Sequence, residues 1–437
     1  MEWQLVLLMI FGGLIVLMAT GMPIAFCFML INIIGVFVFF GGAVGLNQLI
    51  LSINTSLATF VLLPVALFVL MGEVMFLSGM GIDVVEIVDQ WLGRLPGRLA
   101  LLSVGAGTVM ATLTGVSLAS VSILGSLLVP EMEKRGYKKS MTMGPILGSG
   151  GLAVLIPPSG LAVVLGAIAE IPIGRLLIAI IVPGLLLAVL YAVYIIGRCS
   201  LQPSIAPSYK VPPIPTLKKV TSTARYILPI VFIIFMVIGL IFLGVATPEE
   251  AAATGTMGVL LVAFVERRLS WAILKKCVGG TLRVTGMIFL IIAGARTFSE
   301  IMSFSGATRG FSELATNLPV NPILIVVGMQ IVILILGCFM EPVSIMMLTL
   351  PMFMPVIIAL GFDKVWFGAI VMLNIELALI TPPFGTSLFV MKGVASPGTT
   401  MGEVYSAAAP FIGIQLIALA LLIVFPALPL WLPGLMD

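Results

Sequence analysis

The stretch Asn374–Val390, NIELALITPPFGTSLFV, decides the fold of this chain. It places two adjacent prolines and a glycine inside a run that is otherwise apolar enough to enter a membrane. Proline removes a backbone donor and clashes with the preceding helical turn, so Pro382 and Pro383 predict a broken helix. Inside a bilayer such a break leaves carbonyl groups without partners. The break therefore calls for a partner that lipid does not supply.

The composition places this break in a membrane protein. Of 437 residues, 61% are hydrophobic and 9% are charged, and the mean hydropathy is +1.28. Soluble domains carry about 25% charged residues. Many apolar runs reach the ~20 residues that a membrane helix needs. We therefore predict an all-α polytopic membrane protein. The first segment, 1–21, lacks a basic start and a small-residue cleavage site, which predicts a retained span rather than a signal peptide.

The polar residue types argue against an enzyme. The sequence has no histidine, which removes the commonest general base and transition-metal ligand. The four cysteines are scattered and are interpreted as small apolar side chains. The HExxH, GxSxG and GxxxxGK[ST] motifs are absent from the sequence, which disfavours a membrane enzyme and an ATP-driven pump. A passive channel would be indicated by a pore-lining ring of charged residues, and the sequence shows no such ring. A non-transporting assembly subunit would leave the proline breaks without a purpose.

Two apolar segments do not fit a single membrane span. Segment 99–130 is long and has basic residues at both ends, so it should enter and leave on the same side as a re-entrant hairpin. Segment 320–358 is also too long for one span and is interpreted as a second hairpin. This topology puts the N-terminus outside and 17 of the 21 Lys and Arg residues in the cytoplasm. The exceptions are Arg175, Arg309 and Lys364, which fall outside, and Arg296, which falls within a span.

Two stretches of the chain match without a gap at an offset of 225 residues. Residues 136–160 contain IPPSG, and residues 361–385 contain TPPFG. In the predicted topology the first copy begins in the cytoplasm and the second begins outside, so the copies are inverted. Interrupted apolar segments at matching positions of inverted repeats indicate the binding site of a secondary transporter. The identical pairs are Gly136/Gly361, Lys139/Lys364, Leu152/Leu377, Ala153/Ala378, Pro157/Pro382, Pro158/Pro383 and Gly160/Gly385.

The repeat divides the chain into five parts. Residues 1–80 hold scaffold spans, with apolar segments at 4–19, 21–47 and 50–80. Residues 81–197 hold the first hairpin, 99–130, a broken helix, 141–169, and a following span. The remaining parts are a Pro- and Lys-rich cytoplasmic linker at 198–225, scaffold spans at 226–303, and a second set at 304–437 with the hairpin 320–358, the broken helix 365–392 and the last span.

Each proline break predicts a sodium site. Sodium is a hard cation that takes oxygen ligands, and free carbonyls at a break supply them, with the hairpin tip as the opposing wall. A glycine-rich packing interface is the alternative for both places. No transition metal is expected. The predicted ligands of the first site are Thr114, Gly115, Ser117, Ile156, Pro157 and Ser159. Those of the second site are Gly337, Met340, Glu341, Thr381, Pro382 and Gly385.

The half-helices that follow the breaks offer free N–H groups to an organic anion. Ordinary hydrogen bonding between helices is the alternative for the polar residues nearby. The candidate substrate contacts are Ser149, Ser159, Asn374, Thr386 and Ser387, among which Ser149 and Asn374 are repeat equivalents.

Arg296 is a charge inside an apolar run, which makes it a functional-site hypothesis. Glu300 follows one turn later, and we expect an ion pair that faces the protein interior. At an offset of 227 residues, FLSG at 76–79 resembles SFSG at 303–306, and Glu73 pairs with Glu300. We expect both glutamates to fix the fold or to line a domain interface.

The sequence resembles the large membrane subunit of tripartite ATP-independent periplasmic (TRAP) transporters, the DctM-like family, over nearly its whole length. The resemblance lies in LGFDKVWFGAIVMLNIELALITPPFGTSLFV, GSGGLAVLIPPSG, TGVSLASVSILGSLLVPEM and GCFMEPVSIMMLTLP. It implies an elevator-type carrier of the ion-transporter superfamily, with a scaffold and a transport domain of two hairpins and two broken helices. One departure is Val116, which stands where the family's first hairpin tip has a hydroxyl. Sodium ligation there would depend on backbone carbonyls, Thr114 and Ser117.

The resemblance also implies a function and its partners. It implies sodium-coupled import of a small organic anion, a carboxylate or sulfonate, across the bacterial inner membrane. A periplasmic substrate-binding protein would deliver the anion, and a small four-helix, DctQ-like membrane subunit would be a partner. No cofactor and no nucleic acid are expected. The alternative is a stand-alone sodium- or proton-coupled dicarboxylate carrier of the same superfamily that needs no binding protein.

Overall fold

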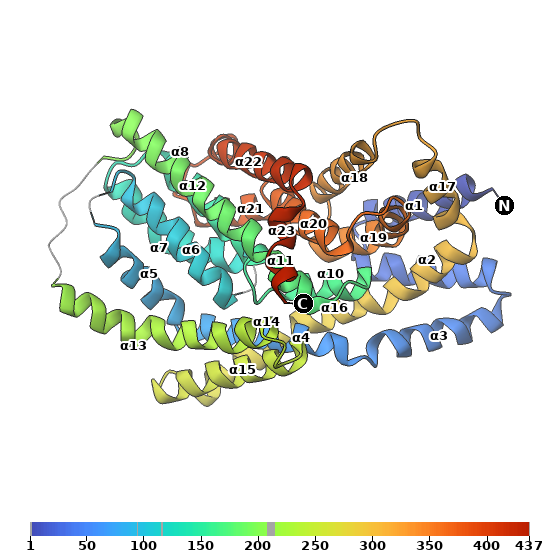
Figure 1. The fold of residues 1–437 in the computed structure, drawn as a ribbon, viewed down its shortest axis with the longest axis horizontal. Coiled ribbons are helices and arrows are strands. Elements are labelled where there is room, and N and C mark those ends of the chain that lie inside the picture. Colours follow the sequence, from blue (N-terminus) through green and yellow to red (C-terminus); the bar gives the residue numbers. More distant parts are fainter. Residues whose placement is uncertain (1, 94, 115–116, 208–214, 437) are drawn as a thin grey trace.

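The computed structural model describes residues 2–93, 95–114, 117–207 and 215–436, and within these ranges every secondary-structure element is helical (Figure 1). The protein is therefore an all-α protein, as predicted. Six stretches in these ranges are long and apolar enough to cross a membrane, or seven if a bent helix pair forms one span. The six are Phe60–Leu77, Ile173–Leu201, Thr216–Phe242, Trp271–Phe304, Pro342–Ala359 and Met401–Val424.

The N-terminal helices are α1 (Trp3–Ala19), α2 (Ile24–Phe39), α3 (Ala43–Leu57) and α4 (Leu63–Leu77), with the short 3-10 helix η1 (Phe60–Leu62) before α4. The sequence predicted one apolar segment over 50–80, but the structure divides it after Leu57. The division follows from local chemistry, because α3 ends in a polar turn and Pro64 occupies the first turn of α4. Proline is tolerated there because its missing N–H has no intrahelical partner.

Two long helices end in the same kind of turn. α4 ends before Gly79, and α16 (Trp271–Phe304) ends before Gly306, each glycine with φ of 76°. Only glycine adopts this left-handed backbone at no steric cost. Amphipathic helices follow these turns, α5 (Met80–Trp91) and α17 (Ala307–Thr316). The matched FLSG and SFSG sequences thus fold alike.

The first hairpin and broken helix are present as helices. α6 (Arg98–Thr114) and α7 (Ser117–Lys134) lie two residues apart in sequence and pack against each other. After them, α8 (Lys139–Gly150) and α9 (Leu152–Leu155) are separated by Ile156–Ser159 from α10 (Gly160–Ala169). The axis bends by 49° at this break, and the Pro157–Pro158 peptide bond is cis.

The second set of elements follows the same order. α18 (Pro322–Gly337) and α19 (Pro342–Ala359) pack against each other. α20 (Lys364–Leu379) then ends five residues after Asn374, and α21 (Thr386–Val394) begins beyond the proline pair. The Pro382–Pro383 peptide bond is also cis. The helix break predicted from NIELALITPPFGTSLFV is therefore confirmed.

The remaining helices connect these sets and close the chain. The connection contains a π-helical turn, η3, which leads into α14, and α15 begins with a capping box between Thr247 and Glu250. The bounds are α11 (Ile173–Ala179), α12 (Ile181–Leu201), η2 (Pro203–Ile205), α13 (Thr216–Ile234), η3 (Phe235–Gly239), α14 (Leu240–Phe242), α15 (Pro248–Val265), α22 (Met401–Val424), α23 (Ala427–Leu430) and η4 (Pro433–Leu435).

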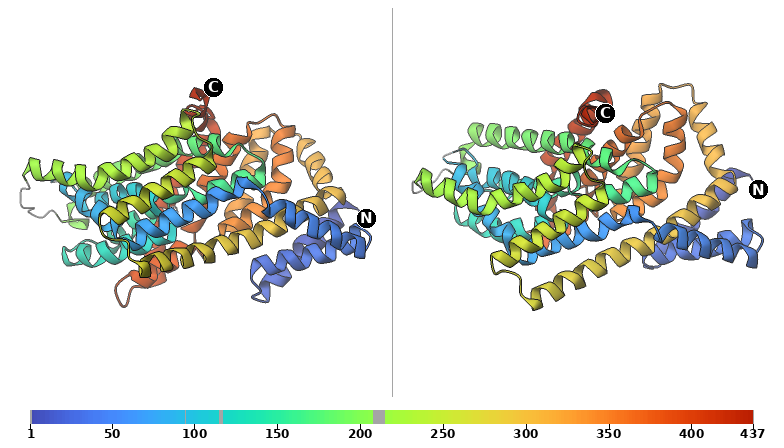
Figure 2. Two further views of the ribbon diagram at one scale, coloured as in Figure 1. Left: turned by 90° about the horizontal axis from the view of Figure 1, so that it is seen from below. Right: turned by 60° about the horizontal axis from the view of Figure 1, so that its bottom comes forward.

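The core of the molecule surrounds α8 and α20. Every residue of α8 from Met141 to Gly150 and every residue of α20 from Val365 to Leu379 is buried. A helix that is buried all round lies inside a bundle. α8 packs on α6, α7 and α22, and α20 packs on α18, α22 and α9. Figure 1 shows α3, α4, α13 and α15 along the edge of the molecule opposite to α8 and α22. In both views of Figure 2 the long α16 runs beside α4.

Candidate functional site

The second break gathers backbone oxygens around Gly385. A Cβ atom at Gly385 would stand 2.6 Å from the carbonyl oxygen of Leu379 and 2.9 Å from that of Thr381. Real Cβ atoms are not found so close to a carbonyl oxygen. Glycine at this position therefore allows these two carbonyl groups to cluster closely around it. Such a cluster has the chemistry that a hard cation requires.

The tip of the second hairpin lies against this break. The Cys338 thiol donates to the carbonyl oxygen of Pro382 at 3.4 Å, and Gly337 packs so tightly on Ala378 that a Cβ would overlap that side chain. The structure therefore brings the predicted residues of the hairpin tip and of the break together. Met340, at the same tip, is buried.

Two side chains of the second predicted sodium site are already hydrogen-bonded. The Glu341 carboxylate caps α19, where it accepts from the Ser344 N–H at 2.9 Å and from the Ser344 hydroxyl at 2.5 Å. The Thr381 hydroxyl donates to the carbonyl oxygen of Leu377 at 2.7 Å. These bonds leave the backbone oxygens as the main ligands that this site offers.

The first break is built around a buried helix cap. Ser159 is fully buried, and its hydroxyl donates to the Val154 carbonyl at 2.8 Å and accepts from the Ala162 N–H at 3.3 Å. An N-cap of this kind satisfies one of the free N–H groups at the start of α10. Ile156 and Pro157 lie in the break itself, where α12 approaches Ile156 through Gly184.

The first hairpin reaches this region from α6 and α7, which both pack on α9. Ser117 is the first residue of α7, and Thr114 is the last residue of α6. Gly115, the third predicted ligand on this hairpin, lies outside the described residues, as does Val116. The structure thus places Ser117 and Thr114 at the predicted tip.

The substrate candidates share one property. Except for Ser159, each has a buried polar atom without a hydrogen-bond partner within the described part of the chain, and the atoms are Ser149 Oγ, Asn374 Oδ1, Thr386 Oγ1 and Ser387 Oγ. Buried polar atoms are nearly always satisfied, so these four atoms are able to bind a ligand, a property they share with other buried atoms such as Ser52 Oγ and Thr285 Oγ1. No hydrogen bond between described residues joins any two of these five side chains. They therefore form separate contact points around the two breaks.

The repeat equivalents Ser149 and Asn374 each face their own hairpin. A Cβ at Gly107 of α6 would stand 2.8 Å from the Ser149 hydroxyl. The Asn374 amide nitrogen donates to the Gln330 carbonyl oxygen of α18 at 2.7 Å and to its side-chain oxygen at 2.9 Å. Asn374 and Gln330 line a cavity of about 300 Å³ whose other walls are apolar side chains of α18 and α22.

Glu376 is a central residue that the sequence analysis did not assign. Its side chain is fully buried in α20, and the Ser117 hydroxyl donates to Oε2 over 3.4 Å. A Cβ at Gly151 would overlap Oε1, and within the described residues Oε1 has no hydrogen-bond partner. An ionisable residue in an apolar, membrane-depth segment was a signal that could have identified it.

Arg296 forms the expected ion pair but not in the protein interior. Its Nε lies 3.3 Å from Glu300 Oε1, and the Arg296 side chain is 53% exposed. The pair lines a polar cleft of about 410 Å³ between α16 and the end of α10, which also contains Glu170. Glu73 lies apart from this cleft, where α4 meets Gly280 of α16. The expectation of a fully interior pair was therefore wrong, because α16 turns this face towards a cavity.

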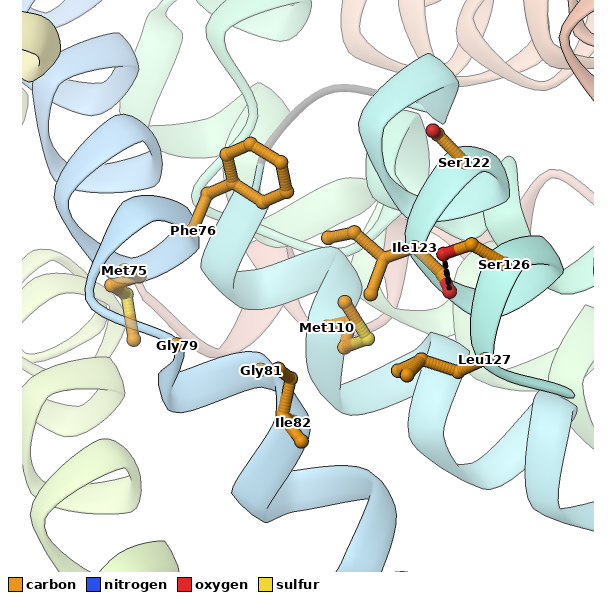
Figure 3. A pocket seen from close by; sticks show the side chains of 10 residues that line it. All are labelled: Met75, Phe76, Gly79, Gly81, Ile82, Met110, Ser122, Ile123, Ser126 and Leu127. Carbon is orange, nitrogen blue, oxygen red and sulfur yellow. Dashed lines mark hydrogen bonds between the residues drawn. The ribbon is translucent and has the colours of Figure 1, made fainter. Parts of the chain in front are cut away.

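A second cavity separates the first hairpin from α4 and α5 (Figure 3). It measures about 230 Å³, and Phe76 and Ile82 on one side face Met110, Ile123 and Leu127 on the other. Most of its lining is apolar, and the Arg98–Asp89 ion pair joins α5 to α6 away from it. The described helices thus define a polytopic membrane protein with two broken helices at its core.

Comparison with known proteins identifies the family. The family description "Tripartite ATP-independent periplasmic transporter, DctM component" matches residues 11–428. The chain belongs to this family. It is therefore a multi-pass membrane permease of the kind of secondary transporter that depends on a substrate-binding protein, and the resemblance seen in the sequence is confirmed.

Individual relatives support the same assignment. The chain is 33% identical over 378 residues to the C4-dicarboxylate TRAP transporter large permease protein DctM of Pseudomonas aeruginosa, with 86% of each chain covered. It is 28% identical to the isethionate TRAP transporter permease protein DctMQ of Oleidesulfovibrio alaskensis, covering 97% of this chain and 66% of that one. The YdaH transporter of Alcanivorax borkumensis shares the fold with a TM-score of 0.67 at 14% identity, covering 89% and 90% of the two chains.

Proposed function

We propose that this permease subunit couples the import of a small organic anion to sodium. The observation that carries the proposal is the carbonyl cluster around Gly385, which faces the second hairpin tip and has the oxygen chemistry of a sodium site. The first break, with Ser117 and the buried cap Ser159, forms the equivalent site. Backbone oxygens of Ile156, Pro157, Thr381 and Pro382 supply the ligands, because a carbonyl at a helix break lacks its intrahelical partner or, like Thr381 and Pro382, keeps a second lone pair beside the one hydrogen bond it accepts.

The two sets of elements act as inverted repeats. The alignment at an offset of 225 residues makes Gly151 and Glu376 equivalent, and these two residues meet in the core. Equivalent residues of two repeats contact each other only close to the pseudo-two-fold axis that relates the repeats. This contact supports a transport domain built from both hairpins and both broken helices, with the segments 99–130 and 320–358 as re-entrant elements.

The transport domain moves as an elevator against a scaffold. The scaffold comprises α1–α4 and α13–α16, and its interface with the first hairpin includes the apolar cavity of Figure 3. Where an interface is lined by apolar side chains, one body can slide past the other, because shear motions consist of small displacements between packed helices. Substrate and sodium would move together with the hairpins.

The substrate is a carboxylate or a sulfonate. Two relatives carry C4-dicarboxylate and isethionate in their names, and this chain offers groups that suit either anion. Helix N-termini at α10 and α21 favour negative charge, and Asn374, Thr386 and Ser387 have polar atoms free for hydrogen bonding. These residues orient the anion between the breaks.

The partners are a periplasmic substrate-binding protein and a small DctQ-like membrane subunit in the bacterial inner membrane. Exposed apolar side chains cover the scaffold helices, including Leu8, Ile15 and Phe37. Apolar surfaces of this kind face lipid or a membrane partner. The N-terminus lies on the periplasmic side in the topology that places most basic residues in the cytoplasm.

Uptake into proteoliposomes tests the proposed function. The vesicles would contain this chain with its small partner, and a panel of radiolabelled carboxylates and sulfonates would be offered with and without an inward sodium gradient and the cognate binding protein. Uptake that requires both the gradient and the binding protein is expected. Uptake that requires sodium but not the binding protein would favour the stand-alone carrier. Uptake indifferent to the gradient would reject sodium coupling.

A further inference from the structure

The Glu376 carboxyl lies in the protein core without a cationic partner. Its side chain is fully buried, and every neighbour along α20 from Val365 to Leu379 is also buried. Among the ion pairs found between described residues, none includes Glu376. An isolated carboxylate in such a place costs far more free energy than a folded protein tolerates. A carboxyl at this position is therefore either protonated or paired with a cation that the described residues do not provide.

The oxygen atoms around Glu376 are spaced for such a cation. The Ser117 hydroxyl lies 3.4 Å from Oε2, whereas a hydroxyl bound directly to a carboxylate lies about 2.5–2.7 Å away. Two oxygens at right angles around a calcium-sized ion stand roughly 3.3–3.7 Å apart, because each lies about 2.3–2.6 Å from the metal. Sodium is similar in size to calcium. The Ser117–Glu376 separation is therefore long for a hydrogen bond to a carboxylate, and it also fits two ligands of one ion.

The second carboxylate oxygen is also available. Oε1 has no hydrogen-bond partner among the described residues, and the same holds for the side-chain oxygen of Gln415. Gln415 lies beside Glu376 on α22, and its amide nitrogen donates to the Tyr191 hydroxyl at 2.8 Å. The same amide group also lies within hydrogen-bonding reach of the Glu376 carboxyl. Side chains of α7, α20 and α22 thus meet at the Glu376 carboxyl.

Gly151 gives the carboxylate access to the first repeat. The position that a Cβ of residue 151 would take is occupied by Glu376 Oε1. Gly151 lies between α8 and α9, five residues before the first break begins at Ile156. The Glu376 side chain therefore extends from the second broken helix and contacts the first one.

We propose that the Glu376 carboxylate is a ligand of a coupling sodium ion, together with Ser117 of the first hairpin. The proposal rests on the sodium coupling proposed above and adds a charged ligand to a site otherwise built from neutral oxygens. It predicts that the bound ion joins α7 of the first hairpin to α20 of the second broken helix. The chain's own contribution is to hold a negative charge at the place where both repeats meet.

The test measures sodium binding to the purified complex of this chain with its small membrane subunit. Binding of ²²Na⁺ and the sodium-dependent rise in unfolding temperature would be compared for wild type, Glu376→Gln, Ser117→Ala and the control Glu313→Gln. Glutamine keeps the shape and removes the charge. We expect Glu376→Gln to weaken sodium binding at least tenfold, Ser117→Ala to weaken it less, and Glu313→Gln, an exposed residue paired with Arg309, to leave it unchanged.

Each outcome has a distinct meaning. Wild-type sodium affinity in a folded Glu376→Gln variant would overturn this proposal and would identify a neutral buried acid, while sodium coupling itself would stand. No sodium binding by the wild type would instead reject the proposed function. If Glu376→Gln does not fold, cryo-electron microscopy maps of the wild type in sodium and in choline decide the question. Density beside the Glu376 carboxylate in sodium alone supports the proposal, and the same empty space in both maps overturns it.

Discussion

Gly151 and Glu376 share a single space in the core of the protein. The Glu376 carboxylate fills the volume that a side chain at residue 151 would need, although 225 positions separate the two residues in sequence. The two residues occupy equivalent positions of the sequence repeat and meet each other. A side chain at one position therefore leaves no room for a side chain at the other. The asymmetry between the two repeats at this point is therefore a steric consequence of their close approach.

Gly151→Ala should destabilise the protein, because the new methyl group overlaps the Glu376 carboxylate. Overpacked cores lose about 1–3 kcal/mol, and occasionally more. Thermal unfolding of the detergent-solubilised complex would measure the loss. Gly286→Ala in α16 is the matched control, since a Cβ at that position would meet no neighbouring group within 4 Å. The double variant Gly151→Ala/Glu376→Ala should recover part of the loss. A double variant no more stable than additivity predicts would contradict the shared space.

Gly385→Ala should damage the second sodium site. Its methyl group would stand within 2.6 Å of the Leu379 carbonyl, so the carbonyl cluster has to open. We expect the sodium concentration for half-maximal uptake to rise at least tenfold, which corresponds to about 1.4 kcal/mol. Gly393→Ala, on the same helix with open space around it, should change this concentration little. An unchanged sodium dependence in Gly385→Ala would remove this glycine from the site.

Ser122→Phe should fill the cavity between the first hairpin and α4–α5 (Figure 3). A ring in this cavity of about 230 Å³ would wedge the two bodies and block their sliding. Uptake should fall at least tenfold while sodium binding persists, because the predicted ligands are elsewhere. Parallel assays of uptake and ²²Na⁺ binding would measure both effects, with the exposed Ser303→Phe as control. Normal uptake by a folded Ser122→Phe protein would argue against movement at this interface.

Arg296→Gln should change stability only slightly. The Arg296–Glu300 pair is half exposed at its arginine, and exposed pairs contribute about 0–1 kcal/mol. Arg98→Gln is the contrast, because the Arg98 side chain is 6% exposed and lies 2.7 Å from Asp89. Breaking a fully buried pair costs about 3–5 kcal/mol, and because the Asp89 side chain is 36% exposed, Arg98→Gln should cost less than this and more than Arg296→Gln. Comparative thermal unfolding would rank the two variants, and a larger loss for Arg296→Gln would show that the cleft pair is structural.

Much of the fold could be predicted because it depends on local backbone chemistry. Pro382 and Pro383 interrupt the helix after α20 whatever the tertiary packing around them, and Pro157 and Pro158 do the same in the first broken helix. The division of the apolar segment 50–80 was missed, because no proline or glycine pair marks the polar turn after Leu57. The predicted segments 99–130 and 320–358 begin and end close to the helix pairs α6–α7 and α18–α19, whereas their re-entrant course stays a prediction.

The candidate site was predictable in part. Cys338 and Gly337 meet the second break as the repeat implied, but the Glu341 carboxylate turns back to cap its own helix. Glu376 was not assigned to the site from the sequence. An acidic residue in an apolar run indicates a functional role, but the sequence does not predict which residues contact it. Its partners come from α7 and from the α8–α9 junction, which are distant in sequence.

The sequence alone determined that this is a helical membrane protein, where its helices break, and to which transporter family it belongs. These properties depend on composition, on proline geometry and on motifs that a linear chain carries by itself. Only the tertiary structure decided that Ser117 faces Glu376 and that Gly151 leaves space for its carboxylate. These contacts join residues that lie more than 200 positions apart, and packing of the two repeats is what brings them together.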